Sequence, residues 1–196
     1  MTRFTLAPVE WDPRLPPLEE SQATPEQIAA LDAAPANQRH SPYLLTLAHD
    51  PGSLAHRGAL FKSVMYAPRG LPRAERELAT AIVSIVNGCV YCTSVHARRY
   101  AELTKKPEVM QRLFDEGLTA SFDPRQDAVI AFSAKLTEDP TAMTAADLAP
   151  LRAAGLGDLE ILDLIHSIAM FANANRLMQA LGDPVMPPDE AAPGAA

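Results

Sequence analysis

Four side chains that can carry out redox chemistry or bind a metal lie close together in the sequence: Glu77, Cys89, Cys92 and His96. Cys89 and Cys92 are the only cysteines of the chain, and His96 follows the second of them by four positions. On a helix, side chains three or four residues apart share a face, with Cβ atoms about 5–6 Å apart. We therefore expect the two sulfurs and the imidazole to form one patch.

A helix end directly before Cys89 indicates how this patch is activated. Apolar residues between positions 74 and 86 recur with a helical period, and the glycine of Asn87-Gly88 is the residue type that ends a helix. A second helix then begins at or just before Cys89, which places Cys92 in or near its first turn. The unpaired N–H groups and the helix dipole there favour an anion, so a thiol can ionise below its reference pKa of about 8.5.

His96 and Glu77 are candidates for a proton relay. A neighbouring imidazole can accept the thiol proton, and a carboxylate from the preceding helix can orient the imidazole. Glu77 is placed for this role if the two helices pack side by side. Glu75 is a competitor, but two residues along a helix rotate a side chain by about 200°, so only one of the two glutamates can face the site.

The spacing of these residues, Glu-x11-Cys-x2-Cys-x3-His, resembles the signature of the alkylhydroperoxidase D-like branch of the carboxymuconolactone decarboxylase family. The resemblance extends over roughly residues 41–182 and is closest to peroxidase-related members. It implies an all-helical fold, homo-oligomers and thiol-dependent reduction of hydroperoxides, an antioxidant activity. By matching positions, it implies Cys92 as the peroxidatic cysteine, Cys89 as its resolving partner, and Glu77 and His96 as the proton relay.

The same resemblance implies no bound cofactor other than a redox-active Cys89–Cys92 disulfide. The implied partners are a hydroperoxide substrate and an external dithiol or thioredoxin-like reductant. One position departs from the family pattern, because Tyr91 stands where well-studied members have a second histidine before the second cysteine. A relay assisted by two imidazoles is therefore not expected.

Other functions of the cysteine pair stay open. Attachment of a c-type haem is excluded, because it requires histidine directly after the second cysteine, where Thr93 stands. Zinc would have Cys89, Cys92 and His96 as ligands, but a closed structural site needs a fourth, from Glu77 or a remote histidine. Three alternatives remain. The chain could be a non-enzymatic zinc-binding or redox-sensing protein, its two cysteines could be inert core residues, or it could be a decarboxylase or lactone-processing enzyme of the wider family.

Composition restricts the class of protein. The chain has 196 residues, enough for one domain with an added arm, and 47% of them are hydrophobic. A net charge of -7 argues against nucleic-acid binding. No apolar run reaches the roughly 18–20 residues that cross a bilayer, and a basic-then-apolar signal peptide is missing, so we expect no membrane association and a cytoplasmic location.

The chain is predicted to be all-α. Polar capping residues precede proline at Pro25, Pro42, Pro51 and Pro124, which is the signal for a helix start. The predicted helices cover Pro25–Ala34, Pro42–Ala48, Ser53–Tyr66, Pro72–Val86, Cys89–Leu103, Pro107–Glu116, Pro124–Glu138, Ala145–Ala154 and Asp158–Leu181. We expect an extended N-terminal arm over residues 1–22, a helical bundle over 23–182 and a flexible tail over 183–196.

The last predicted helix carries polar residues of unassigned role. Asn175 continues an apolar stripe, so we expect a buried amide that needs hydrogen-bond partners. Arg176 is expected at the rim of this stripe, and His166 in the core or at an interface. The resemblance also implies an Asn-Arg pair in this helix, which makes Asn175 a candidate for supporting the site.

Overall fold

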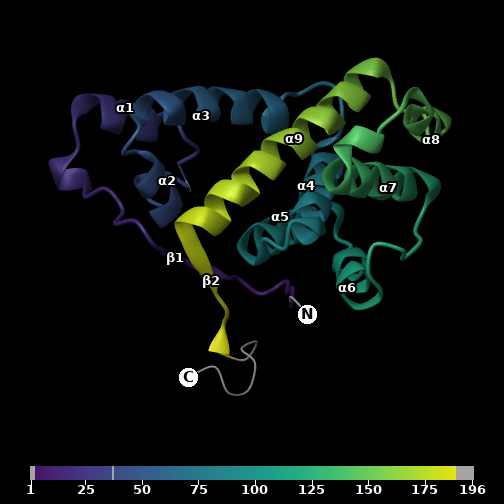
Figure 1. The fold of residues 1–196 in the computed structure, drawn as a ribbon, viewed down its shortest axis with the longest axis horizontal. Coiled ribbons are helices and arrows are strands. Elements are labelled where there is room, and N and C mark those ends of the chain that lie inside the picture. The colour runs from purple at the N-terminus through teal and green to yellow at the C-terminus, as the bar shows by residue number, and fades with distance from the viewer. Residues whose placement is uncertain (1–2, 37, 189–196) are drawn as a thin grey trace.

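The computed structural model describes residues 3–36 and 38–188, and these residues fold into nine α-helices and a two-stranded sheet (Figure 1). The predicted all-α fold class is confirmed. The helices are α1 Pro25–Asp32, α2 Pro42–Leu47, α3 Pro51–Tyr66, α4 Arg73–Val86, α5 Val90–Thr104, α6 Pro107–Glu116, α7 Pro124–Glu138, α8 Leu148–Ala153 and α9 Asp158–Leu181. Short 3-10 turns cover Glu20–Gln22, Pro140–Ala142 and Ala145–Asp147.

The prolines mark helix starts as predicted. The side chains of Thr24, Ser41, Asp50 and Asp123 each accept a hydrogen bond from a backbone N–H in the first turn of the following helix. These bonds satisfy N–H groups that have no partner within the helix, and proline at the first position has no N–H to satisfy. The sequence therefore placed the starts of four helices correctly within two residues.

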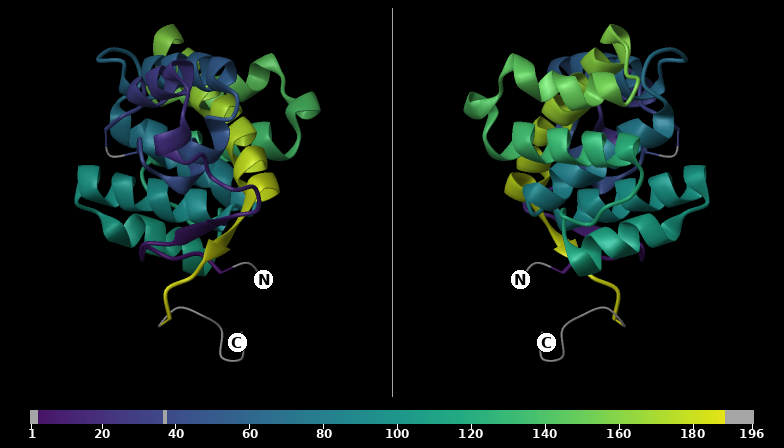
Figure 2. Two further views of the ribbon diagram at one scale, coloured as in Figure 1. Left: turned by 90° about the vertical axis from the view of Figure 1, so that its left-hand side faces the viewer. Right: turned by 90° about the vertical axis from the view of Figure 1, so that its right-hand side faces the viewer.

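Helices α4, α5 and α9 form the centre of the molecule. α9 runs diagonally across the view of Figure 1, with α3 along one side and α7 and α8 along the other, and Figure 2 shows the same layering from two sides. The largest cluster of buried apolar side chains lies among α3, α4, α5, α7 and α9. A second cluster around Trp11 and Tyr43 joins α1 and α2 to Cys89 and Cys92.

A buried ion pair connects α4 to the start of α9. Arg76 is only 1% exposed, and its guanidinium lies 2.9 Å from the Asp163 carboxylate. The same guanidinium donates to the backbone oxygens of Val64 and Arg69. Removing one partner of such a pair leaves a buried charge without compensation, so this contact fixes α4 relative to α9.

The sequence did not predict the sheet. Strand β1, Glu10–Pro13, pairs antiparallel with β2, Gly182–Val185, so Trp11 lies opposite Pro184. The predicted extended arm thus lies on its own domain, and Trp11 donates a hydrogen bond to the backbone oxygen of Met178 in α9. The predicted tail begins at Asp183, but its first three residues belong to β2, while residues 189–196 lie outside the described part.

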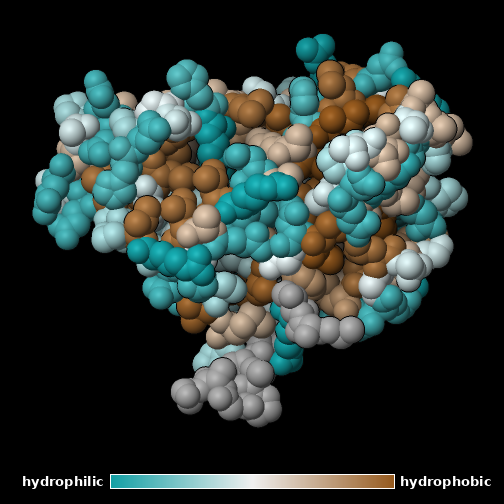
Figure 3. Space-filling model, viewed as in Figure 1, coloured by the Kyte–Doolittle hydropathy of each residue, from teal (hydrophilic) through white to brown (hydrophobic). Residues whose placement is uncertain are grey.

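The surface mixes polar and apolar side chains. Figure 3 shows apolar surface near the upper end of α9, the end that carries the exposed Leu159 and Leu162. A helix able to span a bilayer was not found among the described residues.

Candidate active site

The junction of α4 and α5 places the cysteines. Asn87 ends α4, and Gly88 follows with φ of +69°, a left-handed conformation that side chains other than glycine rarely adopt. Cys89 is then the N-cap of α5, and Cys92 lies in the first turn, as the sequence predicted. The chain reverses here, so α4 and α5 pack side by side and Glu77 faces the cysteine-bearing helix.

Glu77 and His96 are in contact, as expected if α4 and α5 pack side by side. Nδ1 of His96 lies 2.5 Å from Oε2 of Glu77, and the Glu77 side chain is completely buried. The other carboxylate oxygen accepts two hydrogen bonds from the Arg73 guanidinium, one turn earlier on α4. The His96 ring is also held edge-on against Phe171, with ring centroids 4.3 Å apart.

The surroundings keep Glu77 ionised. Burial raises the pKa of its carboxyl group, but His96 and Arg73 together lower it more strongly, so the pKa lies below its ordinary value. Glu75 takes no part in this site. It faces the other way and binds Arg125, which also contacts Glu160 of α9.

The two thiols differ in acidity, in the opposite sense to the sequence expectation. The pKa of Cys89 lies below its ordinary value. The Cys92 thiol, as a hydrogen-bond donor, and the backbone N–H of Cys92 both lower this pKa, and together they outweigh burial, which raises it. For Cys92, the interaction with Cys89 and burial both raise the pKa well above its ordinary value. Cys89, at the N-cap, is therefore the more acidic of the two thiols, and the N-terminus of a helix favours the thiolate form.

Asn175 supports the cysteine pair from α9. Its side chain is completely buried, donates to Oγ of Ser84 and accepts from the Asn87 amide. The Asn175 amide also lowers the pKa of both cysteines. The partners that a buried amide needs are therefore residues of α4 and of the turn that positions Cys89, together with the sulfurs.

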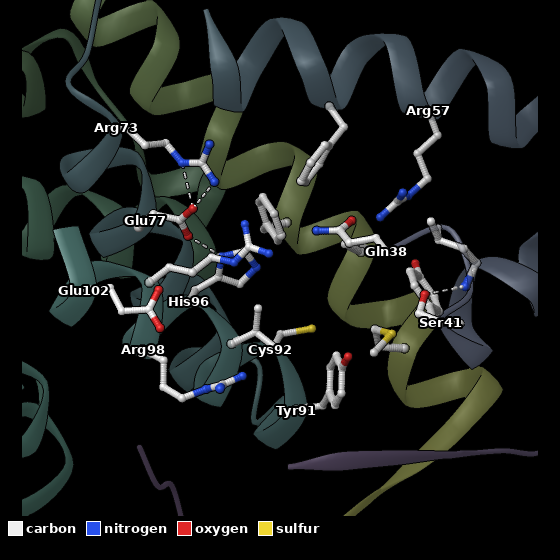
Figure 4. A pocket seen from close by; sticks show the side chains of 18 of the residues that line it. Gln38, Ser41, Arg57, Arg73, Glu77, Tyr91, Cys92, His96, Arg98 and Glu102 are labelled. Atoms are coloured by element: carbon white, nitrogen blue, oxygen red, sulfur yellow. Dashed lines mark hydrogen bonds and ion pairs between the residues drawn. The ribbon is translucent and has the colours of Figure 1, made fainter. Parts of the chain in front are cut away.

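A cavity of about 680 Å³ opens in front of Cys92 and His96. Figure 4 shows the Cys92 sulfur pointing into it, with Glu77 and Arg73 behind His96 and with Arg57, Gln38 and Ser41 on the opposite side. Both cysteines are free and buried, but of the two only Cys92 lines the cavity. Within the described residues, no hydrogen bond joins His96 to Cys92, so proton transfer between them would need a water or a substrate.

The remaining predicted positions are less central. Tyr91, which replaces the second histidine, lines the cavity, and burial raises its pKa. Arg176 is exposed and donates to the backbone oxygen of Ala172, at the rim as predicted, while His166 is exposed and so is not a core residue of the chain. In the described ranges, no group of three or more His, Cys, Asp or Glu side chains is arranged to hold a metal ion.

Sequence reasoning missed several residues of the cavity. Arg73 lies one helical turn before Glu77, and the spacing i to i+4 is a signal that identifies it as a partner of the carboxylate. Arg57 and Tyr43 carry no such signal, because they belong to α3 and α2 and reach the cavity only through the packing of these helices on α5 and α9.

Comparisons with known proteins identify a family and solved structures that this chain resembles. The family model of the carboxymuconolactone decarboxylase family matches residues 51–135. A search of curated proteins found no match. The solved structure of an uncharacterised peroxidase-related protein with an alkylhydroperoxidase AhpD core, from Ralstonia eutropha JMP134, is 26% identical, with a TM-score of 0.75 over 86% of this chain and 90% of that one.

Two further solved structures share the fold. A peroxidase-related protein from Silicibacter sp. TM1040 is 24% identical, with a TM-score of 0.73 over 91% of this chain and 95% of that one. The debrominase Bmp8 is 21% identical, with a TM-score of 0.70 over 85% of this chain and 89% of that one. A cysteine-to-alanine variant of Bmp8 was solved in complex with 2,3,4-tribromopyrrole.

The fold and the match define an alkylhydroperoxidase D-like helical protein. Residues 51–135 match the model of the carboxymuconolactone decarboxylase family, and the resemblance drawn from the spacing of Glu77, Cys89, Cys92 and His96 is confirmed at this level.

Proposed function

We propose that this protein is a thiol-dependent peroxidase or disulfide reductase that reduces hydroperoxides through Cys89 and Cys92. The observation that carries the proposal is the cavity lined by Cys92, His96 and Glu77, with the Cys92 thiol in contact with Cys89. The match to the family model and the fold shared with peroxidase-related proteins support peroxide-related chemistry.

The first step begins with the proton of the Cys92 thiol. Because the pKa of this thiol is raised, a base must take the proton, and His96 is the imidazole in the same cavity. The Cys92 sulfur then attacks the terminal oxygen of the hydroperoxide, and the O–O bond breaks. Sulfur loses two electrons and becomes a sulfenic acid, and His96 returns its proton to the leaving alkoxide, which departs as an alcohol.

The second step uses the lowered pKa of Cys89. Its thiolate attacks the sulfenic sulfur of Cys92, the S–O bond breaks, and the oxygen leaves as water after taking up a proton. An external dithiol then reduces the Cys89–Cys92 disulfide by two thiol–disulfide exchanges. The sum is one hydroperoxide and one dithiol converted into one alcohol, one water and one disulfide.

The direct test is a thiol titration before and after addition of cumene hydroperoxide. One equivalent should consume both thiols, and Cys92→Ser should abolish turnover with a small dithiol as reductant. Cys89→Ser should undergo one oxidation and stop at the sulfenic acid, which a dimedone label detects. Full peroxidase activity in Cys92→Ser contradicts the assignment.

The alternatives give different results in the same experiment. About one zinc per chain, with both thiols blocked until chelation, indicates the non-enzymatic metal-binding function. Decarboxylase or lactone-processing activity that survives thiol alkylation indicates the other enzymatic branch of the family.

Reductive dehalogenation is a second candidate for the same cysteine pair. A protein of similar fold is named a debrominase, and its cysteine-to-alanine variant was solved with a brominated pyrrole. Two thiols supply the two electrons that replace a carbon-bound bromine by hydrogen and release bromide, and the pair ends as a disulfide. Bromide release from 2,3,4-tribromopyrrole, with no thiol loss on addition of hydroperoxide, favours this function.

A further inference from the structure

The cavity in front of Cys92 concentrates positive charge in a chain whose net charge is -7. Its lining includes four arginines, Arg57, Arg73, Arg98 and Arg99, and two glutamates, Glu77 and Glu102. One arginine of the four, Arg73, is bound to Glu77. A cavity with more cations than carboxylates attracts an anion, because low-dielectric walls focus the field.

Arg57 has no carboxylate partner among the described residues. Its guanidinium stacks near the rings of Tyr43 and Phe61, 5.3 and 5.8 Å from their centroids, and Figure 4 shows it reaching into the cavity from α3. The charge of Arg57 also lowers the pKa of Cys92, which places it within electrostatic range of the sulfur. Figure 4 also shows Arg98 and Glu102 together on the opposite side of the cavity from Arg57.

Tyr43, next to Arg57, has a hydroxyl group without a hydrogen-bond partner in the described part of the chain. The side chain lines the cavity and is only 9% exposed, and burial raises its pKa to about 12, so the hydroxyl keeps its proton. A buried hydroxyl without a partner is destabilising, and a ligand oxygen that accepts a hydrogen bond from it removes this cost.

Much of the remaining lining is apolar. It includes the hydrocarbon side chains of Leu44, Phe61, Val95, Leu103, Phe171 and Met178. A planar guanidinium fits a carboxylate with two parallel hydrogen bonds. The cavity therefore suits a molecule with a carboxylate at one end and an apolar body that reaches Cys92.

We propose that Arg57 and Tyr43 bind the carboxylate of the substrate, so that the preferred substrates are organic hydroperoxides that carry a carboxylate group. This inference rests on the proposed peroxidase function for the reactive group of the substrate, the hydroperoxide. The carboxylate subsite itself does not depend on turnover. Arg57 determines specificity here, and Cys92 and His96 carry out the chemistry.

The kinetic test compares two substrates that differ only in charge: cumene hydroperoxide and its para-carboxylate derivative. The rate constant for oxidation of the reduced protein should be higher for the carboxylate by about tenfold or more, the factor that 1.4 kcal/mol provides. Arg57→Gln should remove most of this preference, and Arg57→Lys should retain part of it. Lys62→Gln removes the same charge from an exposed position of the same helix and should keep the preference.

Two kinetic outcomes overturn the proposal. One is equal rates for the two substrates in the wild-type protein. The other is an equal loss of both rates in Arg57→Gln, because Arg57 then acts on the reaction and not on substrate choice. Tyr43→Phe, which conserves volume, should lower the preference by a smaller factor than Arg57→Gln.

A binding experiment separates this proposal from the peroxidase function. Cys92→Ser should bind 4-isopropylbenzoate in isothermal titration calorimetry, and Arg57→Gln in the same background should weaken this binding by about tenfold. Failure of both hydroperoxides to oxidise the thiols, with this binding intact, rejects the peroxidase function and retains the carboxylate subsite. No binding that depends on Arg57 rejects the subsite.

Discussion

Nδ1 of His96 is hydrogen-bonded to Oε2 of Glu77 at 2.5 Å, and this contact determines which ring nitrogen can act as a base. The pKa of Glu77 is lowered, so its carboxyl group is ionised and can only accept hydrogen bonds. Nδ1 must therefore carry a proton. In the neutral ring, Nε2 then carries the lone pair, and this ring lines the cavity beside Cys92.

Glu77→Gln tests this relay. The amide can donate to Nδ1 as well as accept from it, so the ring loses its fixed tautomer, and we expect the rate of Cys92 oxidation to fall by about a hundredfold or more. Stopped-flow measurement of thiol loss provides the rate. Glu75→Gln is the matched control, because Glu75 binds Arg125 away from the cavity and should leave the rate unchanged. Equal losses in both variants contradict the assignment.

Glu77 should also stabilise the fold in a pH-dependent way. Its pKa is lower in the folded chain than the ordinary value of 4.5, so the unfolded chain binds more protons in the interval between these values. The stabilisation is complete above about pH 4.5 and is lost as the pH falls through the folded-state pKa. The difference in unfolding free energy between wild type and Glu77→Gln, from urea denaturation, should be constant at neutral pH and shrink on acidification. A difference that grows on acidification contradicts this.

The hydrogen-bond donor at position 92 should control the acidity of Cys89. Serine can still donate to the Cys89 sulfur, but alanine cannot, and a donor to the charged form lowers a pKa. We expect the pKa of Cys89 to be higher in Cys92→Ala than in Cys92→Ser. Ultraviolet absorbance of the thiolate during a pH titration measures both values. Identical titration curves show that the two sulfurs do not interact.

Asn175→Ala should raise the pKa of Cys89 and slow disulfide formation, because the amide lowers that pKa in the native protein. The variant also leaves the Asn87 side-chain amide without its acceptor, at a cost of about 1–3 kcal/mol in stability, whereas Ser84 still donates to the backbone oxygen of Thr80. The thiolate titration separates these effects, since a purely structural role lowers stability without moving the pKa. Arg176→Ala changes the next, exposed residue and should affect neither quantity.

Gly182→Ala should separate the two strands. A Cβ atom at Gly182 would lie 2.3 Å from the Trp11 ring and 2.5 Å from the backbone oxygen of Asp12, so β1 and β2 must move apart. We expect a loss of about 1–3 kcal/mol of stability and a change in the fluorescence of Trp11. Gly58→Ala is the control, because it has open space around it within α3 and should stabilise the protein by about 1 kcal/mol. An unchanged fluorescence spectrum in Gly182→Ala contradicts the pairing.

The sequence predicted the parts of this molecule that are coded locally. Pro107–Glu116, Pro124–Glu138 and Asp158–Leu181 have the predicted ends, because proline, capping residues and glycine act within one or two turns. Likewise, the grouping of Cys89, Cys92 and His96 followed from helical spacing.

Other features depend on long-range packing. The pairing of Trp11 with Pro184 joins segments far apart in the chain, and a proline-containing strand gives little β signal. The order of the thiol pKa values depends on how Cys89 and Cys92 face each other and on Asn175 from α9. Arg57 and Tyr43 enter the cavity only because α2 and α3 pack against α5, which no local pattern reveals.

The cavity is lined by residues from inside and from outside the segment that the family model matches. Glu77, Cys92 and His96 lie on adjacent helices inside the segment matched by the family model, whereas Tyr43 belongs to α2, which precedes that segment. Substitutions in α2 can therefore reshape the wall that faces the Cys92 sulfur without altering the two helices that carry Cys92, His96 and Glu77.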